Sequence, residues 1–411
     1  MTEAVPKKHL LSLAQEFSLP LIGGVLLAIA WANVSPESYH HFLHWSPLGA
    51  DSELNFHFLF NDIFMVFFFG IAAGEITEAC LPGGALNPPS RAVNPMLATA
   101  GGVLGPVAVY FIWMAITGDH TIHNGWGIPT ATDIALAWLV ARMVFGQGHP
   151  AVSFLLLLAV ADDGIGLAII AIFYPDPSNP VVPAYLGLVA AAMIVAWGMR
   201  RAGLKSFWFY VLGPGAMSWM GLHMAHLHPA LALVAVIPFM PHAERDVGMF
   251  AEEESGVEAV DSLNRFQHFF KLPVDLGLLG FGIANAGVMF SNVGNATWAV
   301  LMSLLVGKTV GIFTFASIAN RFGFPFPRGM NHKILFVAGV TAALGLTVAL
   351  FVAGQAFTDP TLQGAAKMGA VMSAGAAPVA ILLGRILGVK RTAEAESVAD
   401  SSTAGEASTA A

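Results

Sequence analysis

Long apolar runs follow one another along almost the whole chain, and they limit the possible folds more than any other feature. Twelve runs are long enough to cross about 30 Å of hydrocarbon. They lie at 18–34, 58–79, 95–117, 126–145, 150–174, 182–199, 206–220, 222–240, 273–291, 297–318, 334–357 and 365–388. Only 11% of the 411 residues are charged, whereas a soluble domain carries about 25%. The sequence therefore predicts an all-α polytopic membrane protein with about twelve transmembrane helices.

The basic residues predict the orientation of these spans, because cytoplasmic loops are enriched in Lys and Arg. With the N-terminus inside, the 18 basic residues fall on the cytoplasmic side with two exceptions. Lys308 lies inside an apolar run, and Lys367 lies at the start of the last one. We expect one transmembrane domain over residues 1–390 with both termini cytoplasmic. Residues 391–411 have the low-complexity composition of a disordered tail.

Other functional classes lack their sequence signatures. There is no basic stripe interleaved with aromatic residues, so nucleic acid is not an expected partner. The phosphate-binding pattern GxxxxGK[ST], the GxSxG pattern and the HExxH pattern are all absent. The single cysteine, Cys80, excludes an intrachain disulfide. We expect a protein that is not an enzyme and needs no cofactor.

Three carboxylates lie inside the fourth and fifth runs. They are Asp133 in GIPTATDIA and the adjacent Asp162 and Asp163 in LAVADDGIG. A charged side chain at the middle of a bilayer costs roughly 2.5–3.5 kcal/mol on insertion scales, so such residues need a function or a partner. Lys308, alone in LMSLLVGKTVGIF, offers the opposite charge. A purely structural ion pair is the less favoured alternative, because intramembrane charges are by default functional.

The residues before Asp133 predict a break in the fourth span. Pro129 removes a backbone donor, and Thr130 and Thr132 can compete for carbonyl groups. The eleventh run contains a comparable stretch, AGVTAALGLTVAL at 338–350, although a merely flexible helix fits that stretch nearly as well. Broken segments in corresponding halves of a chain are typical of inverted-repeat transporters.

The adjacent aspartates point about 100° apart on a helix, so they cannot face one ligand equally. One of them is expected to complete a site with Asp133, and the other to pair with a cation such as Lys308. Carboxylate and carbonyl oxygens suit hard cations, and protons compete for the same oxygens. The pattern therefore favours exchange of a monovalent cation for protons.

Two further groups of polar residues have alternative interpretations. Glu75 and Glu78 end the second span, where they form either a cation funnel with a possible role in pH sensing or simply the wet end of a helix. The outer loop 33–57 contains four histidines, where an ordinary solvated loop is favoured over a metal site because no cysteine or paired carboxylate joins them. These histidines are His40, His41, His44 and His57.

These residues resemble the NhaA-type sodium/proton antiporter family over about residues 10–390. The segments that carry the resemblance occur in family order and spacing. They are GIPTATDIA (127–135), LAVADDGIG (158–166), IANAGV (283–288), GKTVGI (307–312) and, more weakly, FNDIFMVFFFGIAAGEITE (60–78).

The resemblance implies a fold of ten to twelve helices with crossed broken helices in spans four and eleven. It implies that Asp133 and Asp163 form the cation and proton site, that Thr132 lines it, and that Asp162 pairs with Lys308. The implied activity is pH-controlled, electrogenic expulsion of sodium or lithium in exchange for protons across a bacterial inner membrane. Homodimers held partly by the first outer loop, here 33–57, are usual in the family.

The chain also departs from the family pattern. The second span ends in GEITEACLPGG without the usual basic pair, and Gly164-Ile165-Gly166 follows the aspartates in place of Leu-Gly-Ala. The catalytic set is intact, but the pH-sensing residues of the family are not, so the pH profile of the family is not carried over to this chain. A transporter of the same fold with another ion or solute is one alternative. An intramembrane aspartyl protease is a second, which ADDGIG disfavours because it lacks the GxGD pattern.

Overall fold

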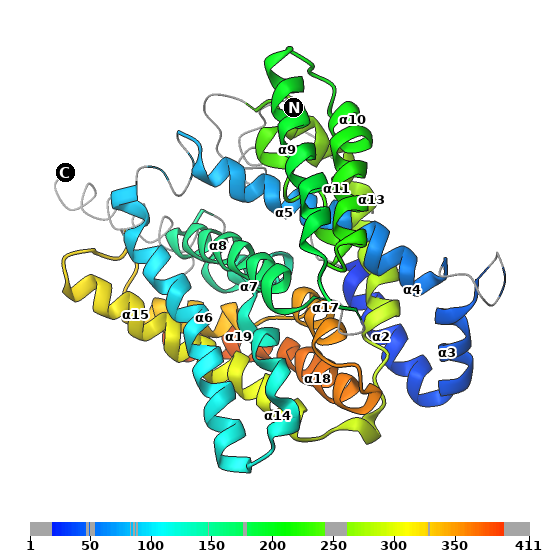
Figure 1. Ribbon diagram of the computed structural model, residues 1–411. Helices are drawn as coiled ribbons and strands as arrows, with labels where there is room; N and C mark the ends of the chain where they lie inside the picture. Colours follow the sequence, from blue (N-terminus) through cyan, green and yellow to red (C-terminus); the bar gives the residue numbers. More distant parts are fainter. Residues whose placement is uncertain are drawn as a thin grey trace, which may run out of the picture.

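The computed structural model describes most of the predicted transmembrane domain. The described residues are 19–46, 49, 54–82, 84, 87, 89–146, 148–175, 179–242, 261–327 and 329–389. These residues form α-, 3-10 and π-helical segments and no β-strand, as Figure 1 shows. The prediction of an all-α protein is confirmed. The expected tail at 391–411 lies outside the described residues.

The first half of the chain contains the elements up to the end of α9. They are α2 (Leu19–Val34), α3 (Pro36–His44), α4 (Phe56–Phe58), η1 (Leu59–Phe64), α5 (Met65–Cys80), α6 (Pro89–Thr117), η2 (His120–Thr130), α7 (Ile134–Phe145), α8 (Pro150–Phe173), η3 (Pro183–Tyr185) and α9 (Leu186–Arg201). The second half begins with a group that stands beside α9 in Figure 1. Its elements are α10 (Phe207–Tyr210), η4 (Val211–Gly215), α11 (Ala216–Met224), η5 (Pro229–Leu231) and η6 (Ile237–Phe239).

The remaining elements complete the second half. They are α13 (Ser262–Asn285), η7 (Phe290–Asn292), α14 (Asn295–Met302), η8 (Ser303–Lys308), α15 (Thr309–Arg321), α16 (His332–Ala342), α17 (Thr347–Ala356), α18 (Pro360–Met372), η9 (Ser373–Gly375) and α19 (Ala376–Ile386).

Six helical stretches in the described residues are long and apolar enough to cross a membrane. They are Phe56–Cys80, Ala92–Thr117, Pro150–Phe173, Pro183–Arg201, Asn295–Arg321 and Pro360–Ile386. Two more candidates are bent pairs, η2 with α7 and α16 with α17, whose halves meet at 59° and 49°. Length and composition thus support six to eight spans, and the count of twelve stays a prediction.

The expected eighth span, 222–240, does not form an α-helix. Its first residues belong to α11, and from His228 to Met240 most backbone N–H groups bond to a carbonyl three residues back, as Ala232 does to Pro229. Pro229 and Pro238 lack the N–H group that an α-helix interior needs. The apolar side chains are nevertheless buried, including Leu233 and Val236. Hydropathy therefore predicted the burial of this segment correctly and its conformation wrongly.

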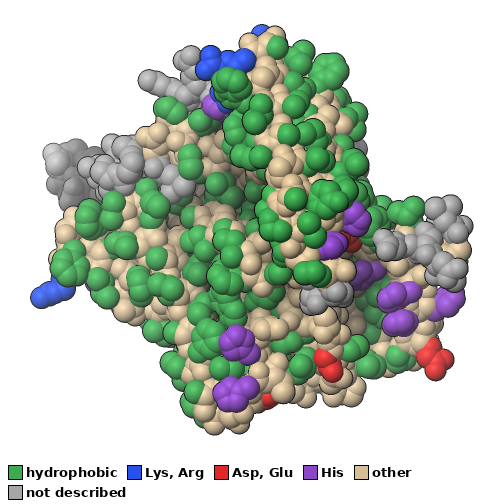
Figure 2. Space-filling view, in the orientation of Figure 1, with side chains coloured by type: hydrophobic (Ala, Val, Ile, Leu, Met, Phe, Trp, Pro, Cys, Tyr) green, Lys and Arg blue, Asp and Glu red, His purple; other side chains and the backbone are tan. Residues whose placement is uncertain are grey.

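Large apolar side chains cover much of the outer surface. Ile116, Ile194 and Leu212 are among the most exposed, and Figure 2 shows hydrophobic atoms spread over the face in view, with Lys and Arg at its margins. Soluble proteins rarely expose apolar surface on this scale. The surface therefore fits a protein surrounded by lipid, as the composition predicts.

Glycines hold α6 against the helix that carries Lys308. Gly101 and Gly105 face Gly307 and Gly311, and a Cβ atom on Gly105 would lie 2.2 Å from the Gly307 carbonyl oxygen. A Cβ on Gly311 would lie 2.0 Å from the Gly101 carbonyl oxygen. Small residues four apart allow membrane helices to approach until their backbones touch. This contact positions Lys308 beside the two bent pairs.

Candidate functional site

The breaks in the two bent pairs touch each other. The backbone N–H of Asp133, between η2 and α7, donates to the carbonyl of Leu344, between α16 and α17, at 2.7 Å. Gly345 in the second break has its N–H 3.3 Å from Ser373 Oγ. Each break leaves backbone N–H and carbonyl groups without helical partners. The two interruptions that the sequence predicts are therefore present, and their free helix ends face one small volume.

The carboxylate of Asp133 caps two helices at once. Its Oδ1 accepts the N–H of Leu136, in the first turn of α7, at 3.0 Å. Its Oδ2 accepts the N–H of Thr347, the first residue of α17, at 3.2 Å and the Thr347 hydroxyl at 2.9 Å. A negative charge is favourable at a helix N-terminus. Asp133 therefore offsets the positive ends of both half-helices, which explains why a buried carboxylate is stable there.

Lys308 lies at the other side of the same break, at the C-terminal end of η2. Its Nζ lies 2.9 Å from Asp162 Oδ2, and both side chains are 0% exposed. Nζ also donates to the carbonyl of Thr130, the last residue of η2, at 2.9 Å. A cation is favourable at a helix C-terminus, where carbonyl groups lack partners. The ion pair that the resemblance implies is present, and it is attached to the break.

Thr132 connects the ion pair to the second break. Its hydroxyl lies 2.8 Å from Asp162 Oδ2 and 3.1 Å from the carbonyl oxygen of Ala342, the last residue of α16. Because the hydroxyl has one proton, it serves one of these acceptors at a time. Thr132 is buried between the two breaks, as expected for a residue that lines the site.

Asp163 differs from its neighbour in having no direct partner. It is 5% exposed, and within the described residues it makes neither an ion pair nor a hydrogen bond, with Oδ1 buried and unsatisfied. The charges of Asp162, Lys308 and Asp133 all act on it. A buried polar atom without a partner is rare and calls for an explanation such as an ion. The two adjacent aspartates therefore have different surroundings, as the 100° angle between them predicts: Asp162 pairs with Lys308, and Asp163 remains without a partner among the described residues.

Glu75 and Glu78 lie on α5, next to the site but outside it. Both are buried, and Glu78 Oε2 accepts a hydrogen bond from Gln267 Nε2 at 3.2 Å. Between them on the helix, Ile76 packs against Gly164, which follows Asp163. The interpretation of these glutamates as a wet helix end is wrong, because α13 covers them. Their proposed part in a cation funnel is not tested by these contacts.

Two further polar groups lie outside the aspartate site. Asn285 of α13 bonds to η1, with its Nδ2 2.7 Å from Asn61 Oδ1. Within the described part of the chain, no group of three or more His, Cys, Asp or Glu side chains is placed to hold a metal. The histidines of α3 therefore gain no support as a metal site.

Sequence reasoning missed Thr347 as a site residue. It lies in the stretch 338–350, for which only an interruption of the eleventh span was expected, whereas it donates twice to Asp133. The available signal was its position, because a threonine that starts the second half of a broken helix can serve a carboxylate in the other break. The Thr130 carbonyl had no signal, since any residue type supplies one.

Known proteins of one family match this chain over almost its whole length. The model of the family described as Na+/H+ antiporter 1 matches residues 8–387. A protein from Geobacter metallireducens named Na(+)/H(+) antiporter NhaA is 59% identical over 381 residues, which cover 93% of this chain and 98% of that protein. The protein of the same name from Desulfitobacterium hafniense is 56% identical over 391 residues, covering 95% and 99%.

A solved structure has a similar fold. It is the sodium proton antiporter MjNhaP1 from Methanocaldococcus jannaschii, at a TM-score of 0.51 and 14% identity, covering 90% of this chain and 98% of that one. At this identity the likeness concerns the fold alone.

Proposed function

The chain belongs to the Na+/H+ antiporter 1 family, and from this premise we propose that it exchanges sodium or lithium for protons as a secondary active antiporter. It is a transporter and not an enzyme. Transport proceeds by alternating access around the contact between the two breaks. No cofactor takes part, and the transported ions are the only small ligands that the reaction requires.

The unpartnered carboxylate of Asp163 is the observation that carries this proposal. Asp162 is neutralised by Lys308 at 2.9 Å, whereas Asp163 has no such cation and lies where the Asp133 charge reaches it. Two buried carboxylates without a counterion must bind either protons or a cation. Sodium and protons therefore compete for Asp133 and Asp163, and Thr132 adds a hydroxyl oxygen to the ligand set.

Competition for one site makes the exchange obligatory. When sodium is bound, its charge favours ionised carboxylates; when sodium leaves, the buried negative charges are relieved by protons. The Lys308–Asp162 pair and the capping bonds of Asp133 hold the breaks in place during this exchange. Glu75 and Glu78, one helix away, form the funnel that leads cations to the site.

The same proposal includes the setting of the protein. The chain is a multi-pass membrane protein, and we place it in the bacterial inner membrane, where it serves sodium and pH homeostasis. A homodimer would pair through the outer loop 33–57, of which α3 is the helical part.

The test is transport in inside-out vesicles. An imposed pH gradient is followed by the quenching of a fluorescent amine, and sodium, lithium or potassium is then added. Sodium and lithium should dissipate the gradient for the native protein and not for Asp163→Asn. Asp359→Asn is the matched control, because this exposed aspartate caps α18 and asparagine caps equally well.

Two outcomes of this transport experiment would contradict the proposal. A response that survives Asp163→Asn would place the cation site elsewhere. A response to none of the three cations between about pH 6 and 9, within the range where carboxylate and histidine groups of perturbed pKa titrate, would favour a same-fold transporter of a different ion or solute.

A further inference from the structure

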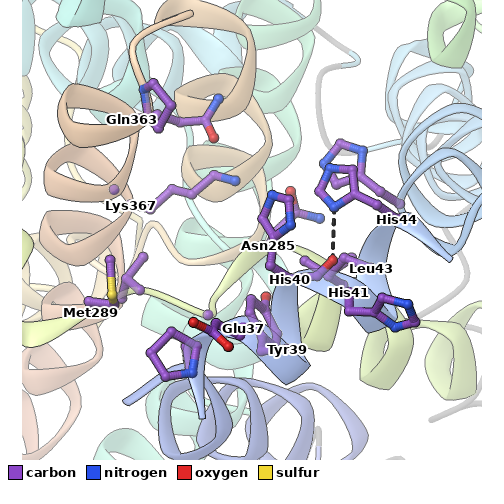
Figure 3. Close-up of a pocket in the computed structure, with 18 of the residues that line it drawn as sticks. Glu37, Tyr39, His40, His41, Leu43, His44, Asn285, Met289, Gln363 and Lys367 are labelled. Carbon is purple, nitrogen blue, oxygen red and sulfur yellow. Dashed lines mark hydrogen bonds between the residues drawn. The ribbon is translucent and has the colours of Figure 1, made fainter. Parts of the chain in front are cut away.

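A cavity lies away from the aspartate site. It has a volume of about 1180 Å³ and lies between α3, the end of α13 and α18. Its lining includes His40, His41 and His44 of α3, Asn285 of α13, and Gln363 and Lys367 of α18, which Figure 3 labels. The predicted topology places this cavity on the outer face, whereas Glu75 and Glu78 lie at the cytoplasmic end of their span.

Lys367 is the unusual member of this cavity. It is 7% exposed, and its side chain reaches from α18 across the cavity toward α3 (Figure 3). It has no hydrogen bond and no ion pair with any other part of the described chain, in contrast to Lys308. The only lining carboxylate among the described residues, Glu37, is exposed and forms no ion pair with it.

A buried ammonium group needs compensation. It can lose its proton, or it can pair with a negative charge. The neighbouring helix α17 has no carboxylate; it approaches Lys367 at Gly354, where a Cβ atom would lie 4.0 Å from the Lys367 Nζ. The described part of the chain therefore supplies no anion to Lys367.

The rest of the lining favours an anion that comes from solvent. Besides Glu37, the polar side chains of the lining are mainly imidazoles and amides, which can donate N–H groups and carry no negative charge. Both ring nitrogens of His57 lie within hydrogen-bond distance of Asn61 Nδ2, at 3.3 and 2.7 Å, and His44 Nδ1 lies 3.0 Å from the His40 carbonyl oxygen. The ring of His40 and the Nε2 atom of His44 are the groups of these histidines that remain for a ligand.

We propose that this cavity is a binding site for a small inorganic anion, with Lys367 as its principal ligand and the imidazoles of α3 as secondary donors. The site is separate from the exchange of sodium for protons, and no transport step is needed to detect it. The probe is chloride, with bromide as its electron-dense substitute.

The first measurement is thermal unfolding of the purified full chain in detergent. Chloride replaces gluconate step by step at constant sodium, because sodium itself stabilises any protein that binds it. The native protein should show a saturable rise in Tm, and Lys367→Met should show none. Lys333→Met removes an exposed lysine at the start of α16 and should respond like the native protein. Lys367→Arg keeps the charge and should keep the response.

The variant Lys367→Met should fold, so the loss of its chloride response can be measured. Lys367→Met removes a buried charge and keeps an unbranched side chain only one atom shorter, so its Tm in gluconate should equal or exceed that of the native protein. In crystals soaked in bromide, anomalous scattering should show a peak in contact with Lys367 Nζ, which is absent in Lys367→Met.

Three results would overturn the proposal. A chloride response that persists in Lys367→Met would be a general salt effect. No chloride response in the native protein would mean that Lys367 is neutral or that the cavity holds only water. A response to phosphate-bearing lipid and not to chloride would assign the cavity to a lipid headgroup. Loss of sodium transport in any variant changes none of these readings, so the antiport proposal and this one fail separately.

Discussion

At the scale of single residues, the site consists of charges placed at helix ends. Asp133 lies at the N-termini of α7 and α17, and Lys308 at the C-terminal carbonyl of η2. Each charge is favourable in the field of the helix end that it faces. This arrangement lets the chain keep ionisable groups in an apolar interior while leaving one carboxylate, that of Asp163, for a ligand.

The Lys308–Asp162 pair should behave as a unit in stability measurements. Lys308→Met leaves a buried carboxylate without its counterion, which should cost about 3–5 kcal/mol. Asp162→Asn with Lys308→Met removes both charges and should be less destabilised than Lys308→Met alone. A double-mutant cycle from chemical denaturation measures this coupling. Additive effects of the two substitutions would show that the pair contributes no interaction energy.

His149 should make the fold sensitive to acid. It precedes α8 outside the membrane span, and its Nδ1 accepts the N–H of Ala151 at 3.1 Å. Burial lowers its pKa below the usual 6.5. The folded state therefore disfavours the proton that the unfolded state accepts, so this contribution to stability is complete above about pH 6.5 and is lost as the pH falls toward the lower folded pKa.

The measurement is the Tm between about pH 7.5 and 5, the range in which histidine titrates. His149→Asn keeps a capping side chain without a titrating group, so its Tm should fall less over this range than that of the native protein. His123→Asn, an exposed histidine in η2, is the control. Parallel Tm curves for the native protein and His149→Asn would contradict the prediction.

At the scale of helices, close glycine packing determines where the charges lie. The contact of Gly101 and Gly105 with Gly307 and Gly311 brings the backbones of α6 and α15 together. Lys308 follows Gly307 directly and lies in the π-helical segment η8. A π-helical turn displaces side chains from their regular positions, and such turns are frequent at functional sites. The ion pair therefore depends on a packing contact made by other residues.

Adding one methyl group to this contact should be costly. Gly311→Ala places a Cβ atom 2.0 Å from the Gly101 carbonyl oxygen, so the helices must separate. Overpacking of this kind costs about 1–3 kcal/mol or more, and it should also reduce transport by displacing Lys308. Gly198→Ala in α9 has no atom within 4 Å of the new methyl group and should be neutral or slightly stabilising. Equal Tm values for the two variants would contradict this packing argument.

The sequence predicted those parts of the site that differ most from their surroundings. A carboxylate in an apolar run is conspicuous, and so is Pro129 before it, so the aspartates, Lys308 and the first break were all identified. Thr347 was missed as a ligand of Asp133 because threonine is common in membrane helices. Lys367 was noted only as an exception to the charge pattern, since its burial depends on how α3 and α18 pack.

At the scale of the whole molecule, the segment 225–240 decides the topology. If it crosses the membrane, the chain has the expected twelve spans and both ends of the domain lie inside. Its turns satisfy most of their backbone groups through bonds between residues three apart, and its apolar side chains are buried. A tightly wound segment of this kind can cross a membrane where neighbouring helices shield it from lipid. We therefore expect it to cross.

Cysteine labelling on whole cells tests this crossing. In a Cys80→Ala background, His223→Cys at the end of α11 should react with a membrane-impermeant maleimide added outside, because the topology places it on the outer face. Arg265→Cys in α13 and Lys205→Cys before α10 should react only after the cells are opened. All three residues are exposed, so their reactivity reports sidedness more than burial.

The informative comparison is between His223→Cys and Arg265→Cys. Labelling from opposite sides requires one crossing between them, and residues 225–240 are the only described segment of sufficient apolar character in that interval. Labelling from the same side would mean that this segment returns to the face it came from. The basic residues after it would then lie on the outer face, and α18 could not share a cavity with α3 of the outer loop, as it does in this structure.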